Sequence, residues 1–287
     1  MLPSRVLLVD SNFLRVPNLR DFLAQSSENA IALDHLVLFE IFKTNPLLTS
    51  RKSLLIAAEF VDQVYVIKPS HRWLNKVITC EEDLEGLIDE DATAALRECC
   101  HGLFDDPPSQ DVASYLAARE VEAAQYLARL TDEMGEYEEA LRDRAAQFSK
   151  GQLTEIRTGV DVSDKTREQI SEMLHEVTGH FILSYQEPGR TQPLATAMAR
   201  NMFAFRYALC VVLFYIEWVQ SGRTSKGLTK RVNDIIDLQI ATASTFFSGL
   251  ASNDALTLSV GRAATRLLAQ WGAFIRFSDA PNQNNLS

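Results

Sequence analysis

The chain has 287 residues, of which 46% are hydrophobic and 23% charged, and its net charge at pH 7 is −10. This composition excludes a disordered chain, apart from the polar tail SDAPNQNNLS, and predicts a globular protein with one large domain or two smaller ones. No basic segment followed by an apolar stretch and a small-residue cleavage site opens the sequence, so secretion is not indicated and we expect a cytoplasmic protein.

The first seventy residues predict strands and helices in alternation. The apolar run RVLLV at residues 5–9 predicts a buried strand, and Asp10 follows it directly. A residue that follows a strand of an open α/β sheet lies at the carboxyl edge, where such sheets bind ligands. The next expected elements are helices near residues 18–27, 33–43 and 50–60 and the strand QVYVIK at 63–68, in the order βαα(α)β.

An acidic residue interrupts the apolar face of the second of these helices. In ALDHLVLFEIFKT, the face that runs through Leu33, Leu36 and Val37 continues onto Glu40. A buried carboxylate needs a partner. We therefore expect Glu40 to face a bound cation or to form a buried salt bridge with an arginine.

Long helical patterns separated by prolines dominate the middle of the chain. They predict a charged amphipathic helix or hairpin at residues 109–148 and further helices at 163–184 and 193–220. The last contains the apolar run MFAFRYALCVVLFYIEWV. Because Arg206 and Glu217 interrupt this run, it predicts a buried helix and no membrane span.

The four cysteines are expected to be reduced thiols. They lack the pair spacing of a metal site, and adjacent Cys99 and Cys100 are poor disulfide partners. His101 follows this pair and is expected to be an ordinary helix residue.

The last part of the chain returns to an α/β pattern. NDIIDLQIATAS predicts a helix opening in which Asp234 and Asp237 share one face. TFFSGLAS predicts a strand that leads to Asp254, and a helix at 255–271 and the strand AFIRFS follow. The alternation predicts a parallel α/β core with a large helical insertion.

Acidic residues from distant segments are thus expected at one edge of this core. A hard cation such as Mg²⁺ or Mn²⁺ would neutralise carboxylates that otherwise repel one another. Such a cation lowers the pKa of a bound water and stabilises charge that develops on a phosphate. The sequence therefore predicts hydrolysis of phosphodiester bonds.

Three segments resemble the PIN-domain nuclease superfamily, and they occur in order: VLLVDSNFL, LVLFEIFK and DIIDLQIATAS…LASNDALTLS. The resemblance implies a PIN-like core at residues 1–70 and 223–287, interrupted by an acidic helical insertion at 71–222. It also favours RNA as the substrate, although DNA is equally compatible with the chemistry. The implied site comprises the catalytic, metal-binding acids Asp10, Glu40, Asp237 and Asp254, the further ligand Asp234, and the supporting residues Asn12 and Asn253.

Most of these acids also have a purely structural interpretation. Asp10 would start an Asx turn in the sequence DSN. Asp234 and Asp254 precede helical runs and would act as N-caps. Asp237 would be a first-turn acid favoured by the helix dipole.

Charge is distributed unevenly along the chain. Residues 80–180 contain nine Lys and Arg against 25 Asp and Glu, a net charge of −16, whereas residues 1–79 carry +2 and residues 181–287 carry +4. Basic residues near the predicted metal site would attract a phosphate backbone, although each alone is typical of a solvated surface. They are Lys43, Arg51, Lys52, Arg223, Lys226, Lys230 and Arg231.

Two classes of function follow. The first is a nuclease that acts on RNA, as a toxin, a defence effector or a processing enzyme, or that cuts DNA in a defence system. The second is a non-catalytic PIN-like module that binds a protein partner. The acidic insertion is expected to project away from the site and to offer apolar faces to a partner or to a second copy in a homodimer, or else to cover the site.

Overall fold

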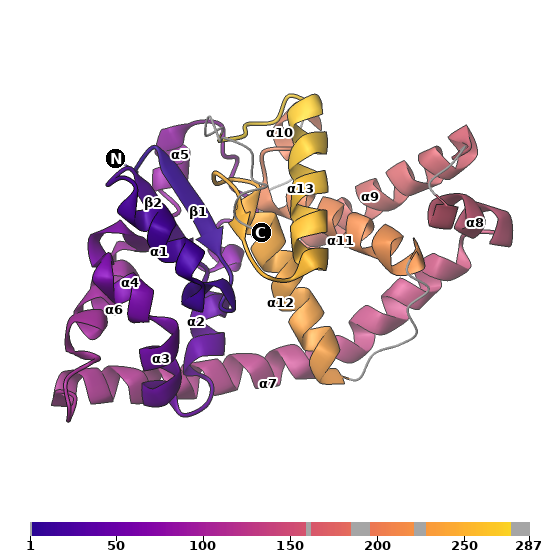
Figure 1. Cartoon of the computed structure of the whole chain (residues 1–287). Coiled ribbons are helices and arrows are strands. Elements are labelled where there is room, and N and C mark those ends of the chain that lie inside the picture. The colour runs from indigo at the N-terminus through magenta and orange to yellow at the C-terminus, as the bar shows by residue number, and fades with distance from the viewer. Residues whose placement is uncertain (1, 159–161, 185–195, 221–227, 277–287) are drawn as a thin grey trace.

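The computed structural model describes residues 2–158, 162–184, 196–220 and 228–276. Within these ranges, four strands form one all-parallel sheet in the order β3-β2-β1-β4, seen at the left and centre of Figure 1. The fold is therefore α/β, as the sequence predicts. The strands are β1 (Arg5–Val9), β2 (Asn29–Leu33), β3 (Val64–Val66) and β4 (Leu250–Ala251).

The strand order sets where a ligand can bind. From β1 the chain adds β2 and then β3 on one side, and much later it returns to place β4 on the other side of β1. The direction of strand addition thus reverses between β1 and β4. In open parallel sheets, the crevice beyond the carboxyl ends of two such strands is the usual ligand site.

The helices fall into two groups, short ones within residues 13–72 and a second set, short and long, that follows. The first group is η1 (Phe13–Arg15), α1 (Pro17–Ala24), α2 (His35–Phe42), α3 (Pro46–Ser53), α4 (Leu55–Glu59), η2 (Val61–Gln63) and η3 (Ser70–Arg72). The second is α5 (Glu81–Glu85), α6 (Glu90–Gly102), α7 (Gln110–Ala146), α8 (Lys150–Thr158), α9 (Asp164–Ser184), α10 (Thr196–Ala199), α11 (Phe203–Gln220), α12 (Leu228–Ser244) and α13 (Ala255–Gln270). The strands predicted at 5–9 and 63–68 and the helix predicted at 255–271 are confirmed.

Three sequence predictions need correction. The segment NAIAL forms β2, so Leu33 ends a strand and the helix begins only after Asp34, whose side chain accepts a hydrogen bond from Leu36 N. Asp234 and Asp237 lie inside α12 and not at its opening, because the helix starts at Leu228. Residues 273–276 form no strand.

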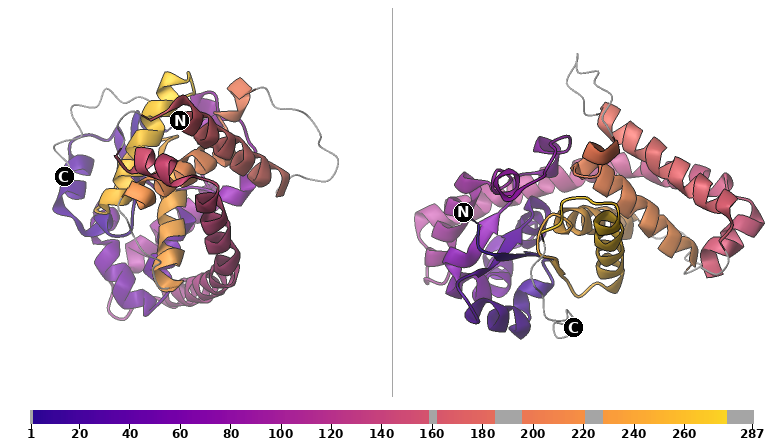
Figure 2. Two further views of the ribbon diagram at one scale, coloured as in Figure 1. Left: turned by 90° about the vertical axis from the view of Figure 1, so that its right-hand side faces the viewer. Right: turned by 90° about the horizontal axis from the view of Figure 1, so that it is seen from above.

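Helix α7 joins three other helices. It is one helix of 37 residues, not a hairpin, and it packs against α2, α3 and α12 through a buried stripe that includes Val112, Leu116, Ala123 and Leu130. Figure 1 shows it running from α3, past the foot of α12, towards α8. Part of the acidic insertion, α7, therefore packs against the rest of the molecule, and its projection away from the site stays a prediction. Helices α8 and α9 lie at the far end of the molecule from α1 and α4 (Figures 1 and 2).

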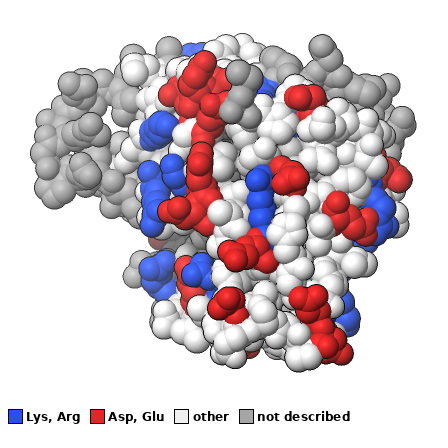
Figure 3. Space-filling view, turned by 90° about the vertical axis from the view of Figure 1, so that its left-hand side faces the viewer, with Lys and Arg blue, Asp and Glu red and all other residues white. Residues whose placement is uncertain are grey.

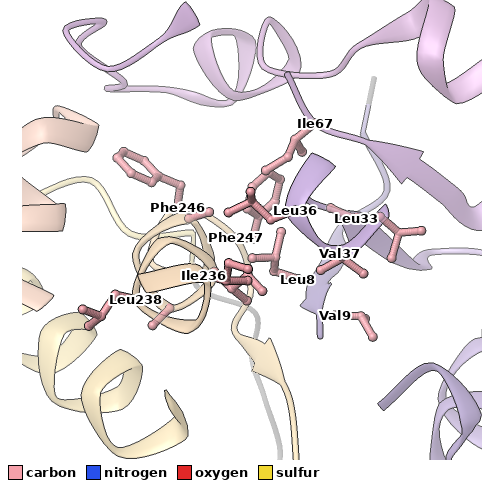
Figure 4. Close-up of a cluster of buried hydrophobic side chains, with 14 of the residues drawn as sticks. Leu8, Val9, Leu33, Leu36, Val37, Ile67, Ile236, Leu238, Phe246 and Phe247 are labelled. Atoms are coloured by element: carbon pink, nitrogen blue, oxygen red, sulfur yellow. The ribbon is translucent and has the colours of Figure 1, made fainter. Parts of the chain in front are cut away.

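A common apolar core positions α2 and α12 against the sheet. Side chains from β1, β2, α2 and α12 meet in it (Figure 4), and burying each contributes about 1.5–3 kcal/mol. The residues labelled there are Leu8, Val9, Leu33, Leu36, Val37, Ile67, Ile236, Leu238, Phe246 and Phe247.

Buried Arg206 joins α11 to the residue Arg200 before it and to the segments that follow α12 and α13. Its guanidinium donates to the carbonyl oxygens of Arg200, Thr245 and Phe274 at 2.6–2.9 Å and lies 3.6 Å from the centre of the Phe246 ring. Burial lowers its pKa to about 9. The apolar run therefore forms a buried helix, as the sequence predicts. Among the residues that the structure describes, none of the helices combines the length and apolar character that a membrane span needs.

The prediction that the four cysteines are reduced thiols is confirmed. All four cysteines are unpaired, and burial raises the pKa of Cys99 to about 11 and the pKa values of Cys100 and Cys210 to about 12. These thiols therefore remain protonated and contribute to the core.

Candidate metal centre

Asp10 lies where β1 and β4 end side by side. The strands are paired through Val9 and Ala251, and Asp10 N donates to Ala251 O at 2.9 Å. Only 2% of the Asp10 surface is exposed. Both oxygens of its carboxylate accept hydrogen bonds, Oδ2 from Ser252 Oγ at 2.9 Å and Oδ1 from Ser11 Oγ at 3.4 Å. Asp10 is therefore fixed at the reversal of the strand order.

Glu40 is joined to Asp10 by a shared hydroxyl. Ser11 Oγ lies 2.5 Å from Glu40 Oε2, so one serine contacts both carboxylates. Burial and the neighbouring Asp10 raise the pKa of Glu40, while the Ser11 hydrogen bond and Lys43 lower it. Glu40 forms no salt bridge with an arginine in the described part of the chain, so the alternative partner expected from the sequence is absent there.

Asp254 follows β4 and caps α13. Its Oδ1 accepts hydrogen bonds from Thr257 N at 2.7 Å and from Thr257 Oγ1 at 2.8 Å. The N-cap interpretation is thus confirmed for Asp254. Its backbone N–H donates to Ser252 Oγ, the same hydroxyl that donates to Asp10. The two acids are therefore positioned by one serine.

Asp237 stands at the centre of the acidic group. Burial raises its pKa to about 8, and Asp10, Asp254, Glu40 and Asp234 each add to this rise. These five acids come from α2, α12 and the carboxyl ends of β1 and β4. Asp237 forms no hydrogen bond or ion pair with any other described residue. Among the described residues, Asp237 therefore has acidic neighbours and no Lys or Arg partner of its own.

Asp234 lies one turn before Asp237 on α12 and is partly exposed. Because it is the seventh residue of the helix, the N-cap interpretation is wrong for Asp234. The first-turn interpretation of Asp237 is wrong for the same reason.

The two asparagines named from the sequence do not contact the acids. Asn12 and Asn253 are both exposed, and Asn253 Nδ2 donates to the backbone oxygen of Asn12 at 3.3 Å. The hydrogen-bonding partners of the acids are instead Ser11 and Ser252, each one residue earlier in the chain.

The donor set fits a hard cation that keeps part of its water shell. All its oxygens belong to carboxylates and serine hydroxyls, which are ligands that Mg²⁺ and Mn²⁺ accept. Within the described ranges, however, no group of three or more His, Cys, Asp and Glu side chains is arranged so that it could hold a metal ion as it stands. The acids are close enough to raise the pKa of Asp237 but do not form a closed ligand shell. Mg²⁺ usually binds proteins in this way, through one or two carboxylates and several waters.

The basic residues that the sequence predicts near the metal site differ in their surroundings. Lys43 and Lys52 are exposed, but Arg51 donates to the carbonyl oxygens of Leu103 and Asp105 and so anchors the connection between α6 and α7. On the face shown in Figure 3, basic and acidic side chains are interspersed. Arg223 and Lys226 lie outside the described residues, as do the side chains of Lys230 and Arg231.

Comparisons of the chain with protein-family models, curated proteins and solved structures find no match. Its function is therefore inferred from the acidic group itself.

Proposed function

We propose that this chain is a divalent-metal-dependent nuclease with a PIN-like core, and that Mg²⁺ or Mn²⁺ binds among Asp10, Glu40, Asp237 and Asp254. One observation carries the proposal. A partly buried carboxyl, Asp237, has four acidic neighbours and no basic partner among the described residues. Its neighbour Asp10 lies at the reversal of the strand order, which is the usual ligand site of such sheets.

The residues of the chain have distinct roles in this mechanism. When bound, the cation would supply an activated water and stabilise charge on the scissile phosphate. Ser11 and Ser252 hold the Asp10 carboxylate in one orientation through its two oxygens. The raised pKa of Asp237 favours its protonated form in the metal-free protein, and its deprotonated carboxylate would help to hold the cation.

RNA is the preferred substrate because of the resemblance of the three acidic segments to PIN-domain nucleases. The chemistry of the acids suits DNA equally. One observation favours the alternative of a non-catalytic protein-binding module, namely that the described acids do not form a closed ligand shell.

One assay separates these functions. Purified protein is incubated with single-stranded RNA, transfer RNA and plasmid DNA, with Mg²⁺, with Mn²⁺ and with EDTA. We expect metal-dependent cleavage of RNA that EDTA stops and that Asp237→Asn abolishes. Asp62→Asn, at an exposed acid of η2, is the matched control and should cleave at the wild-type rate. Absence of cleavage of all three substrates would favour the protein-binding module.

A further inference from the structure

A second group of charged side chains, which are basic, lies at the same carboxyl edge of the sheet, after β3 and two strands away from Asp10. His71 and Arg72 belong to η3, the short helix that follows β3, and Arg129 belongs to α7. All three side chains are exposed. None of them forms a hydrogen bond or ion pair with another side chain in the ranges that the structure describes.

The η3 segment is attached to the helix that carries Asp237. Ser70 Oγ, next to His71, donates to Gln239 Oε1 of α12 at 3.1 Å. Gln239 is two residues beyond Asp237. The segment that follows β3 is therefore joined to α12, although Gln239 and Asp237 lie on different faces of that helix.

Arg129 is attached to the helix that carries Glu40. Its guanidinium lies 5.2 Å from the centre of the Tyr126 ring. That ring packs 4.9 Å from Phe39 and 5.7 Å from His35, both of which belong to α2. Aromatic stacking of this kind holds the guanidinium in place while its N–H groups stay available to a ligand.

The positive groups influence one another. The pKa of His71 is lowered by burial and further by His35, Arg72 and Arg129. His71, Arg72 and Arg129 thus lie near His35 where α2, α7 and η3 come together, and His35 Nδ1 itself lies 2.8 Å from Asp34 Oδ1. In a chain with a net charge of −10, such a group attracts anions.

We propose that His71, Arg72 and Arg129 form a subsite for a backbone phosphate of the nucleic acid, beside the carboxylates that hold the cation. This inference rests on the proposed nuclease function. The two arginines suit a phosphate because a guanidinium donates paired hydrogen bonds to its oxygens. A nucleic acid strand presents one phosphate after another, so one can lie at the cation while another lies at the arginines. Helix α7 would then form part of the substrate path.

The test is equilibrium binding of a fluorescein-labelled single-stranded oligoribonucleotide to the full chain. Asp237→Asn is used as the background, with EDTA present, so that the strand is not cut. The double variant Arg72→Glu/Arg129→Glu should bind about tenfold more weakly at moderate salt, and the slope of log affinity against log salt should fall by about 0.7 for each lost phosphate contact. A second double variant, Lys150→Glu/Arg266→Glu, makes the same charge change at exposed positions of α8 and α13 and should bind as the background does.

A spectroscopic measurement distinguishes contact from long-range attraction. In NMR titrations, the pKa of His71 should rise when the oligoribonucleotide is added, since a nearby phosphate favours the imidazolium. Binding and a salt slope that are the same in both double variants would overturn the subsite while leaving the nuclease proposal intact. If the background protein does not bind the strand and the wild-type chain does not cut it with Mn²⁺, the nuclease proposal fails and the subsite fails with it.

Discussion

The ionisation of Asp237 makes the stability of the metal-free protein depend on pH. Its folded pKa of about 8 is above the reference value of 3.8. The folded state therefore holds the proton more tightly than the unfolded chain does. A raised folded pKa contributes stability that is fully present below about pH 4 and is lost as the pH rises to about 8.

The first prediction follows from the direction of this pKa shift. Asp237→Asn removes the ionisable group and keeps its volume, so in EDTA it should stabilise the protein much more at pH 9 than at pH 5, where most of the contribution of the raised pKa is still present. Thermal melts at both pH values measure the difference, at roughly 2–4 °C per kcal/mol for a domain of about 150–250 residues. Asp62→Asn serves as the control. A gain that is equal at pH 5 and pH 9 would show that the charge of Asp237 is not its cause.

The second prediction concerns Ser252, a positioning residue. Its hydroxyl donates to Asp10 Oδ2 and accepts from Asp254 N, and the residue is 5% exposed. Ser252→Ala should cost about 1–3 kcal/mol of stability and should weaken Mn²⁺ binding by about 10–100-fold.

A matched serine separates the two effects. Ser248 is also buried, and its hydroxyl accepts a hydrogen bond from Val6 N at 3.1 Å without contacting an acid. Ser248→Ala should therefore destabilise the fold but leave Mn²⁺ affinity unchanged. If both variants lose metal affinity equally, Ser252 has no specific role at the site.

The sequence identifies acids better than it identifies their partners. Asp10 and Asp254 can be found because each follows an apolar strand. Their hydroxyl partners cannot, because Ser11 and Asn12 are both small polar residues after the same strand and only the three-dimensional turn decides which one faces the carboxylate. The hydrogen bonds to the acids come from Ser11 and Ser252, each one residue before the asparagine that the sequence suggests, and a supporting role for Asn12 and Asn253 stays a prediction.

At the scale of elements, Asp254 has two separable roles. It caps α13 through Oδ1 and lies beside Asp237. The third prediction is that Asp254→Asn keeps the cap and loses cleavage, whereas Asp254→Ala loses cleavage and also about 1 kcal/mol of stability. Urea unfolding measures stability, and the RNA assay measures cleavage. An asparagine variant that cuts RNA at the wild-type rate would reduce Asp254 to a capping residue.

The sequence predicts the types of the elements near the site better than it predicts their boundaries. The strand β2 is five residues long and fully buried, so NAIAL shows no alternation that would distinguish it from the helix that follows. Asp34 marks the true boundary as the N-cap of α2. The first turn of α12 consists mostly of polar residues, so the apolar pattern that predicts a helix begins only at Val232.

At the scale of the molecule, the acidic centre depends on segments that are far apart in sequence. Glu40 and Asp237 are held together partly by α7, which packs against both of their helices. Removing residues 80–180 would expose Phe39 and Phe42, which contact Tyr126 and Tyr115 of α7. That deletion would therefore disrupt the site itself and could not test whether the insertion restrains activity.

The fourth prediction links the bound cation to the stability of the whole chain. A cation that binds only the folded state adds stability that grows with its concentration, about 2.7 kcal/mol at 100 times its Kd. Because protons compete for Asp237, Mn²⁺ should raise the melting temperature strongly at pH 9 and weakly at pH 6. Asp237→Asn should reduce the shift at pH 9, and Asp62→Asn should not. A melting temperature that is unaffected by Mn²⁺ at pH 9 would mean that the acids do not bind a metal.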